Sequence, residues 1–249
     1  MTAVGLLEAF LPPILVAVAA FALGRVSDRH RRRRALGHLL ELVGSAGRVK
    51  LVAPSFTVSS FIPREVRGRA ALPTNVHLMP YAEGVAIGRL MGVLAMLAPK
   101  LPLVTATSDN HEEAPGEVVI SIGGPSVNAV SAALLADNFP EFQIDYPSHI
   151  GHFREHTFSP KVNAAHQLTE DFGFLFFARD PDGASRLVVC GIWAFGTALA
   201  VSTLLSAAHR PLLSQHISLS RRALVVVHGT VHGLTTGRPQ LVLQEAFGS

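Results

Sequence analysis

The stretch EVVISIGGPSVNAVSAALLADNF, residues 117–139, decides the predicted fold because a strand pattern passes directly into a helix pattern. Residues 117–122 are largely apolar, as expected for a strand that is buried on both faces of a sheet. Gly123, Gly124 and Pro125 then permit a tight turn, and proline suits the first position of a helix. This turn is either a ligand-binding loop or only a tight connection between strand and helix.

Short apolar runs alternate with helical segments on both sides of this stretch. Residues 48–55, 75–81 and 101–108 read as strands, and a helix is predicted over residues 82–98. Strands that are separated by helices run parallel to one another. The sequence therefore predicts an α/β fold, namely a Rossmann-like, mostly parallel sheet flanked by helices.

The second half of the chain carries mixed signals. Residues 140–170 are polar and are predicted to be irregular, and residues 196–208 read as a helix. The apolar runs at residues 171–180 and 186–195 flank the turn sequence PDG, which predicts an antiparallel hairpin. Residues 221–247 read as two further β segments joined by a glycine-containing turn.

The first 24 residues are nearly free of charge, and Glu8 is the only charged side chain among them. A helix needs about 20 apolar residues to cross a bilayer, so residues 1–24 predict a transmembrane anchor. Pro12 and Pro13 would kink or shorten that helix. A cleaved presequence or a buried N-terminal helix would give the same pattern.

Six arginines between Arg25 and Arg34 follow this segment directly. Because positive charge favours the cytoplasmic side, we expect a single-pass membrane protein whose C-terminal domain is cytoplasmic. The cluster is expected to bind anionic membrane lipids. Nucleic acid is a less favoured partner, because no aromatic interleaving or second basic cluster accompanies the run. The predicted organisation is thus a transmembrane anchor (1–24), a basic juxtamembrane helix (25–46) and a Rossmann-like α/β domain (47–249).

The cysteine and histidine residues do not predict a metal site. The single cysteine, Cys190, excludes an intramolecular disulfide and a cysteine-based metal cage, and its apolar surroundings favour a core position. His149, His152 and His156 would share one face of a helix and could then bind zinc. Gly151 argues against a helix at this place.

Two junctions between strand and helix have the composition of ligand-binding loops. Ligands of open parallel sheets bind at the carboxyl ends of the strands, where free N–H groups at helix starts attract anions. The predicted ligand-binding residues are Gly123, Gly124, Ser126, Asn128, Gly196 and Thr197. Ordinary helix capping would explain the same residues. Neither junction has the G-x-G-x-x-G spacing or the lysine of a Walker A loop.

Glu83 is the candidate catalytic residue. It lies at the start of a predicted helix, where the helix dipole alone would stabilise a carboxylate. Glu83, Gly84 and Ala86, followed after the helix by a Pro-Leu-Val strand, resemble a motif of the nucleoside deoxyribosyltransferase-like Rossmannoid enzymes. The resemblance covers residues 80–104 only, and it implies that Glu83 is a nucleophile at a sugar carbon. The acidic ligand-binding residue of that family's early strand has no counterpart in KLVAPS, residues 50–55.

The sequence does not show which of the other acidic residues are functional. The loop after residue 108 reads as a solvated loop or as a contact to a ligand or divalent cation; its polar residues are Asp109, His111, Glu112 and Glu113. Asp145 and Asp171 are either general acid–base groups or ordinary capping and solvated residues.

Together these patterns predict a domain that binds a nucleotide or another phosphorylated small molecule, with Glu83 cleaving or transferring a glycosidic bond. The alternative is a non-enzymatic, membrane-tethered sensor or interaction scaffold, in which the same loops bind a signal or cap helices. No pattern in the sequence identifies a cofactor or a protein partner.

Overall fold

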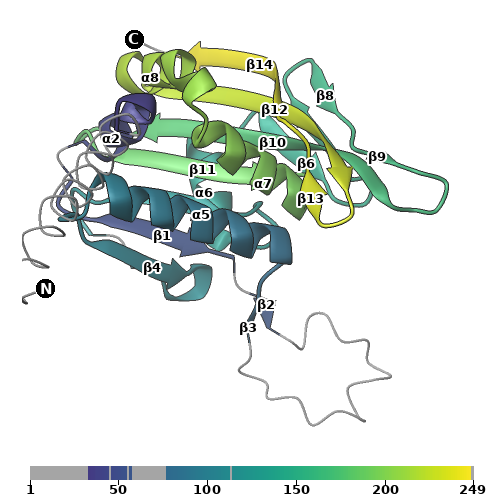
Figure 1. Cartoon of the computed structure of the whole chain (residues 1–249), viewed down its shortest axis with the longest axis horizontal. Coiled ribbons are helices and arrows are strands. Elements are labelled where there is room, and N and C mark those ends of the chain that lie inside the picture. The colour runs from purple at the N-terminus through teal and green to yellow at the C-terminus, as the bar shows by residue number, and fades with distance from the viewer. Residues whose placement is uncertain (1–32, 45, 55, 58–76, 113, 248–249) are drawn as a thin grey trace, which may run out of the picture.

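The computed structural model describes residues 33–44, 46–54, 56–57, 77–112 and 114–247 (Figure 1). Its centre is a nine-stranded sheet with the order β13-β12-β10-β11-β5-β1-β4, in which β14 pairs with β12 and β9 with β10. The strands are β1 (Val49–Ala53), β4 (Leu103–Thr107), β5 (Val118–Ile122), β9 (Lys161–Val162), β10 (Leu168–Arg179), β11 (Ser185–Gly191), β12 (Arg222–His232), β13 (Thr235–Thr236) and β14 (Gln240–Phe247).

This sheet is mixed, so the prediction of a Rossmann-like, mostly parallel sheet is wrong. The pairs β4–β1, β1–β5 and β5–β11 are parallel. The pairs β11–β10, β10–β12 and β12–β14 are antiparallel, and this part of the sheet curls into a half-barrel. The predicted hairpin is present as β10 and β11.

The direction of each strand follows from its connection. Strands β11 and β12 both pair antiparallel with β10, so they run in the same direction and are joined by a helical crossover. Strands β10 and β14 run in the opposite direction. Strand β10 lies between β11 and β12, and β14 pairs with β12. The rule that strands separated by helices run parallel therefore holds for β11 and β12. It gives no information about β10 and β14, which run in the opposite direction.

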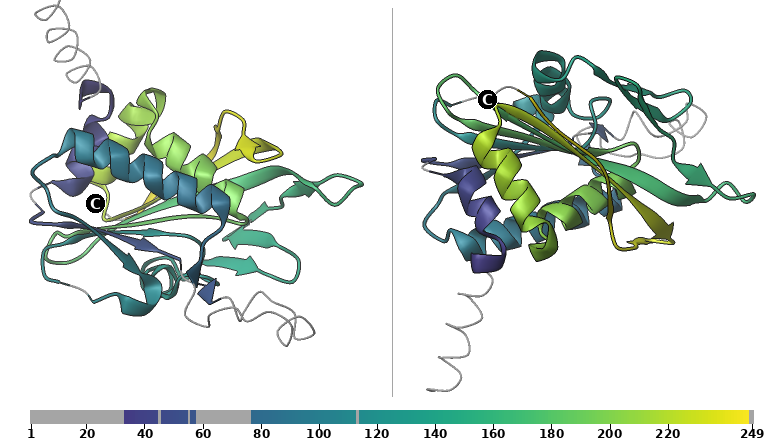
Figure 2. Two further views of the ribbon diagram at one scale, coloured as in Figure 1. Left: turned by 60° about the horizontal axis from the view of Figure 1, so that its bottom comes forward. Right: turned by 90° about the horizontal axis from the view of Figure 1, so that it is seen from above.

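Helices cover one face of the sheet, and a helix with a small sheet covers the other (Figure 2). The first face carries α2 (Gly37–Val43), α5 (Tyr81–Leu97), α7 (Ala194–Leu204) and α8 (Arg210–Leu219). The opposite face carries α6 (Ala129–Asn138) and the antiparallel sheet of β6 (Phe142–Asp145), β7 (Ile150–Phe153) and β8 (His156–Phe158). The fold thus has three layers.

Alternate residues of the central strands supply two separate cores. On the helical face, Leu51 of β1 and Ile120 of β5 pack in one cluster with Leu90 of α5. On the opposite face, Phe174 of β10 packs with Phe153 of β7 in a cluster rich in phenylalanine. Both cores are built from side chains that alternate along the strands, as the pleat of a sheet requires.

Three segments differ from the sequence prediction. The segment 140–170, predicted to be irregular, contains the small sheet and β9. The predicted strand at 75–81 is reduced to β3 (His77–Leu78), which pairs with β2 (Phe56–Thr57) outside the central sheet. Helix α8 was not predicted.

The predicted transmembrane anchor (1–24) and the arginines up to position 32 lie outside the described residues. Within the described ranges, no helix has both the length and the apolar composition that a membrane crossing requires. The prediction of a single-pass membrane protein with a cytoplasmic C-terminal domain is corrected accordingly, because the structure gives it no support. Arg33, the first described arginine of the cluster, donates from Nη2 to the carbonyl oxygen of Leu97 (3.1 Å), at the end of α5.

A buried ion-pair network closes the amino end of the parallel strands. Glu117, which is 1% exposed, accepts from Lys50 Nζ at 2.6 Å and from Arg48 Nη2 at 2.6 Å. Lys50 also donates to the carbonyl oxygen of Glu112. The network links β1 to the residue that precedes β5 and thus helps to hold these two strands in register.

We expect Lys50→Met to lower the free energy of unfolding by about 2–3 kcal/mol, because Glu117 would keep a buried charge with only Arg48 as its partner. The matched control is Lys161→Met, which removes an exposed pair with Glu170 (2.9 Å) and should cost less than about 1 kcal/mol. Chemical denaturation measures both values. Equal losses in the two variants would contradict the structural role of the buried network.

Candidate functional site

The carboxyl ends of β1 and β5 form the topological switch point of the parallel half of the sheet. After β1 the chain enters α5 on one face, and after β5 it enters α6 on the opposite face. Where neighbouring strands send their helices to opposite faces, the connections separate and leave room for a ligand. Residues from the starts of α5, α6 and α7 meet at this edge.

Glu83 lies in the first turn of α5 and is buried, with 4% of its surface exposed. Its Oε1 accepts a hydrogen bond from Thr197 Oγ1 (3.3 Å), in the first turn of α7. Its Oε2 is buried and has no hydrogen-bond partner among the described residues. The structure therefore brings two predicted site residues together, and one buried carboxylate oxygen of Glu83 has no donor among the described residues.

Burial raises the pKa of Glu83 to about 7, and the hydrogen bond from Thr197 acts in the opposite direction. The carboxyl group loses the solvation that its ionised form needs, and no cation among the described residues compensates for this loss. Near pH 7 the group therefore exists in both protonation states, which is the condition that favours a general acid or base.

Gly123 and Gly124 pass directly beside this carboxyl group. Gly123 has φ +99°, and a Cβ atom there would lie 3.4 Å from Glu83 Oε1 and 3.2 Å from Pro54 Cβ. Glycine is thus required by the backbone conformation, and its small size also keeps the space beside Glu83 free. A Cβ at Gly124 would lie at ordinary contact distance, 3.6 Å from Tyr146 Oη and from the carbonyl oxygen of Gly191.

Asn128 is engaged in capping rather than directed at the crevice. Its Oδ1 accepts from the N–H groups of Val130 and Ser131, and its Nδ2 donates to the carbonyl oxygen of Ile122 at 2.8 Å. Ser126, which is exposed, donates its N–H to Tyr146 Oη at 3.0 Å. The first turn of α6 therefore has its N–H groups largely satisfied by the protein itself.

Asp171 has the same role at α7. Its carboxylate, fully buried, accepts from the N–H groups of Phe172 (2.8 Å), Trp193 (3.3 Å) and Gly196. Burial raises the pKa of Asp171 to about 8, and the three backbone donors lower it in part. Because the N–H groups of Trp193 and Gly196 donate to Asp171, they are not available to bind an external anion.

Glycine at the β10–β11–α7 junction is required for packing. A Cβ at Gly196 would lie 1.9 Å from the carbonyl oxygen of Phe172, and one at Gly191 would lie 2.4 Å from the N atom of Thr197. A Cβ at Gly173 would lie 2.2 Å from the carbonyl oxygen of Gly196. These contacts place α7 directly against the strands and so place Thr197 beside Glu83.

Three aromatic side chains at this edge were not predicted as site residues. Trp193, the N-cap residue of α7, is 40% exposed, and its ring contacts that of His149 in a tilted arrangement at a centroid distance of 4.0 Å. Tyr146 precedes His149 in the β6–β7 connection and contacts the Gly124 turn. The predicted apolar run 186–195 included Trp193, whereas β11 ends at Gly191 and Trp193 lies between this strand and α7.

The remaining candidates lie elsewhere. The loop with Asp109 forms a short 3₁₀ turn after β4, and its Glu113 lies outside the described residues. His149, His152 and His156 lie in a turn and on two different strands, not on one helix face. In the described part of the chain, no group of three His, Cys, Asp or Glu side chains is arranged to hold a metal ion. Cys190 is fully buried.

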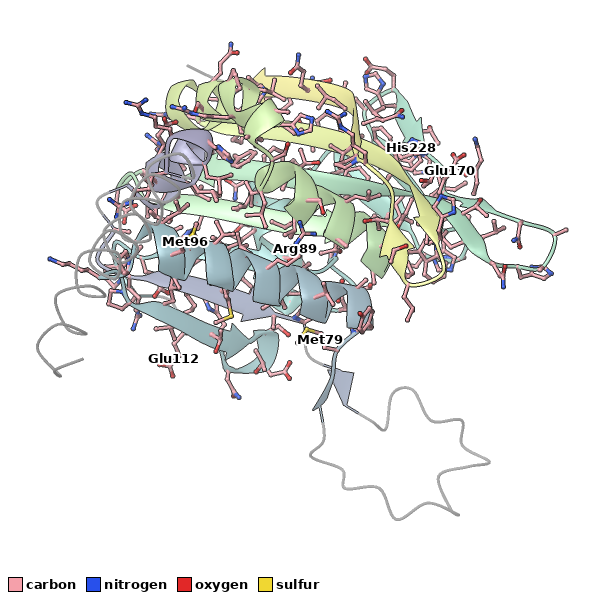
Figure 3. All side chains as sticks on the ribbon, in the orientation of Figure 1. Met79, Arg89, Met96, Glu112, Glu170 and His228 are labelled. Atoms are coloured by element: carbon pink, nitrogen blue, oxygen red, sulfur yellow. The ribbon has the colours of Figure 1, made fainter. Side chains whose placement is uncertain are left out.

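Figure 3 shows where several labelled side chains lie relative to α5 and the strands. Met79 lies beside the start of α5, near the carboxyl edge, whereas Arg89 and Met96 lie farther along the same helix. His228 Nε2 and Glu170 Oε2 lie 2.9 Å apart, and this pair joins β12 to β10. The side chains that contact Glu83 and the Gly123–Gly124 turn include no lysine or arginine among the described residues.

The fold and the site define a three-layer α/β protein with a mixed sheet and a buried carboxyl group at its switch point. No protein-family model matches the chain, and no curated protein matches it significantly in sequence.

The first prediction from this geometry concerns Gly196. We expect Gly196→Ala to lower the free energy of unfolding by more than about 3 kcal/mol, because the new methyl group meets the carbonyl oxygen of Phe172. Gly88→Ala is the control, since nothing lies within 4 Å of its added Cβ and the site is an exposed helical position. That control should gain about 0.5–1 kcal/mol. A Gly196→Ala protein as stable as the wild type would refute the packing role.

The second prediction concerns the pH dependence of stability. Because the folded-state pKa of Glu83 is about 7 and the reference value is 4.5, the native state binds more protons within this window. The contribution of Glu83 to stability should therefore fall as pH rises from 4.5 to 7, by at most roughly 3 kcal/mol, and Asp171 acts in the same direction. Glu83→Gln removes the charge, so we expect it to be more stable than the wild type at pH 8 and similar at pH 4.

Thermal or urea denaturation of both proteins from pH 4 to pH 8 measures this difference. Glu155→Gln changes a carboxylate that is 77% exposed and serves as the control. A constant difference between Glu83→Gln and wild type over this range would show that the buried carboxyl group does not titrate as described.

Proposed function

We propose that this protein binds a nucleotide-like small molecule at the crevice between β1 and β5 and that Glu83 acts on its glycosidic bond. The observation that carries the proposal is the buried carboxyl group of Glu83, which has one oxygen held by Thr197 and the other without a partner among the described residues. A buried polar atom without a partner is costly, and such atoms concentrate where a ligand completes the contact.

The electrostatics of this carboxyl group suit the cleavage of a glycosidic bond. When the bond between the sugar carbon and the base breaks, the electron pair leaves with the base and positive charge develops on the sugar. An ionised Glu83 stabilises that charge strongly, because burial removes competing solvent and no lysine or arginine among the described residues pairs with it. The carboxylate then acts as a nucleophile at the sugar carbon or as a base toward a water molecule.

The surroundings of Glu83 favour a substrate that is held close to the backbone. Gly123 presents no side chain toward the carboxyl group, and the switch-point crevice is the usual ligand position in open sheets of this type. The N–H groups that Asn128 and Asp171 occupy do not contribute to anion binding. Support for the proposal therefore comes from the carboxyl group and its position, with the E-G-V-A resemblance as an additional argument.

The full chain should release free base when incubated with substrates of this class, for which adenosine, AMP and NAD are suitable first probes. We expect Glu83→Gln to reduce the rate by more than about 100-fold, because the amide can neither attack nor accept a proton. The wild-type rate should rise with pH through about 7, as the pKa of Glu83 requires. Base release is measured by chromatography.

Thr197→Val is the informative companion variant. It removes the hydroxyl group that favours the ionised form, so the rise in rate should move to higher pH while turnover is retained. Binding of these probes without base release from any of them would favour the non-enzymatic alternative, a sensor. If none of them raises the melting temperature of the full chain, the nucleotide-like ligand is excluded for this panel.

A further inference from the structure

The exposed ring of Trp193 is fixed at the same edge as Glu83. Trp193 is the N-cap residue of α7, and its N–H donates to Asp171 Oδ1 at 3.3 Å. Thr197, which holds Glu83, lies one helical turn farther along. The backbone of Trp193 is thus anchored by a buried carboxylate, while its side chain remains 40% exposed. An exposed indole on a rigid support is unusual for a position that serves only the core.

His149 supports this indole from the opposite layer of the protein. The two rings lie 4.0 Å apart between centroids, with an interplanar angle of 35°. His149 adopts φ +53°, a left-handed conformation that is costly for a residue other than glycine. Strained backbone of this kind persists where the surroundings require it, and it often occurs at ligand sites. This tilted ring contact joins the β6–β7 connection to the start of α7.

The chemistry of this pair suits a flat, electron-rich ring. Aromatic side chains in protein sites contribute about 1–3 kcal/mol per stacked base, and this contribution does not require phosphate contacts. Asn128 and Asp171 accept the N–H groups at the starts of α6 and α7, so these groups are not available to bind a phosphate. Stacking on an aromatic side chain is then the contact that would hold a ligand here. Thr197, whose hydroxyl group holds Glu83, lies one helical turn beyond Trp193 on the same helix.

We propose that Trp193, supported by His149, is the stacking platform for the heteroaromatic base of a nucleoside-type ligand. This inference rests on the proposed function, since the sugar carbon of the same ligand reaches Glu83. Trp193 sets the position of the base, and Tyr146, which accepts from the N–H of Ser126, closes the turn beside it.

Trp193 is the only tryptophan of the chain, so its emission reports on this site alone. Titration of the full-length Glu83→Gln protein with adenosine, which this variant does not turn over, should quench tryptophan fluorescence saturably. Calorimetry should show that a second change, Trp193→Leu, weakens adenosine binding by about 10–100-fold, as loss of a stacked base predicts. Trp193→Phe should retain most of the affinity, because the aromatic face remains.

Leu234→Ala removes a side chain that is 68% exposed in the β12–β13 turn and should leave the affinity unchanged. The platform is refuted if adenosine binds with equal affinity to the Trp193→Leu protein, or if saturation leaves tryptophan emission unaltered. Failure of the proposed reaction gives a different result: Trp193-dependent binding persists, but the wild type releases no base. Far-UV circular dichroism and melting temperatures show whether each variant is folded.

Discussion

The contact of Asp171 with the start of α7 is the interaction on which the rest of the site depends. One buried carboxylate, placed at the beginning of β10, accepts the N–H groups of Trp193 and Gly196 and so holds α7 against the strands. The absence of side chains at Gly173, Gly191 and Gly196 allows this close approach. Because β10 is the first antiparallel strand beside the parallel ones, the same contact joins the two halves of the sheet.

Sequence patterns predicted β1, β4 and β5, the β10–β11 hairpin and two β segments in residues 221–247, but they did not predict that all of these strands form one mixed sheet. A buried strand reads as the same apolar run whether its neighbours are parallel or antiparallel, so the run in β12 carries no information about its partner. Only a short turn reveals an antiparallel pair, as it did for β10 and β11. The polar surface of the segment 140–170 concealed its small sheet, because that sheet buries one face only.

The sequence indicated where the candidate site lies, but it did not indicate what each of its residues does. Glu83, Gly123 and Thr197 were recognisable as residues at strand ends, and the structure brings these three together. The capping partner of α7 was not recognisable, because Asp171 lies more than 20 residues before the N–H groups that it accepts. Asn128 has a local capping role, which the sequence could not separate from ligand binding.

The comparison of the two buried carboxyl groups gives the strongest argument for a ligand at Glu83. Asp171 is as deeply buried as Glu83, yet three backbone N–H groups satisfy it, which is sufficient reason for its burial. Glu83 has only the Thr197 hydroxyl, and its second oxygen lacks a partner among the described residues. A glutamine or an apolar residue would fit this position at lower cost. Among the described residues, Glu83 therefore lacks the set of partners that accounts for the burial of Asp171, and this difference supports the proposal of a ligand at Glu83.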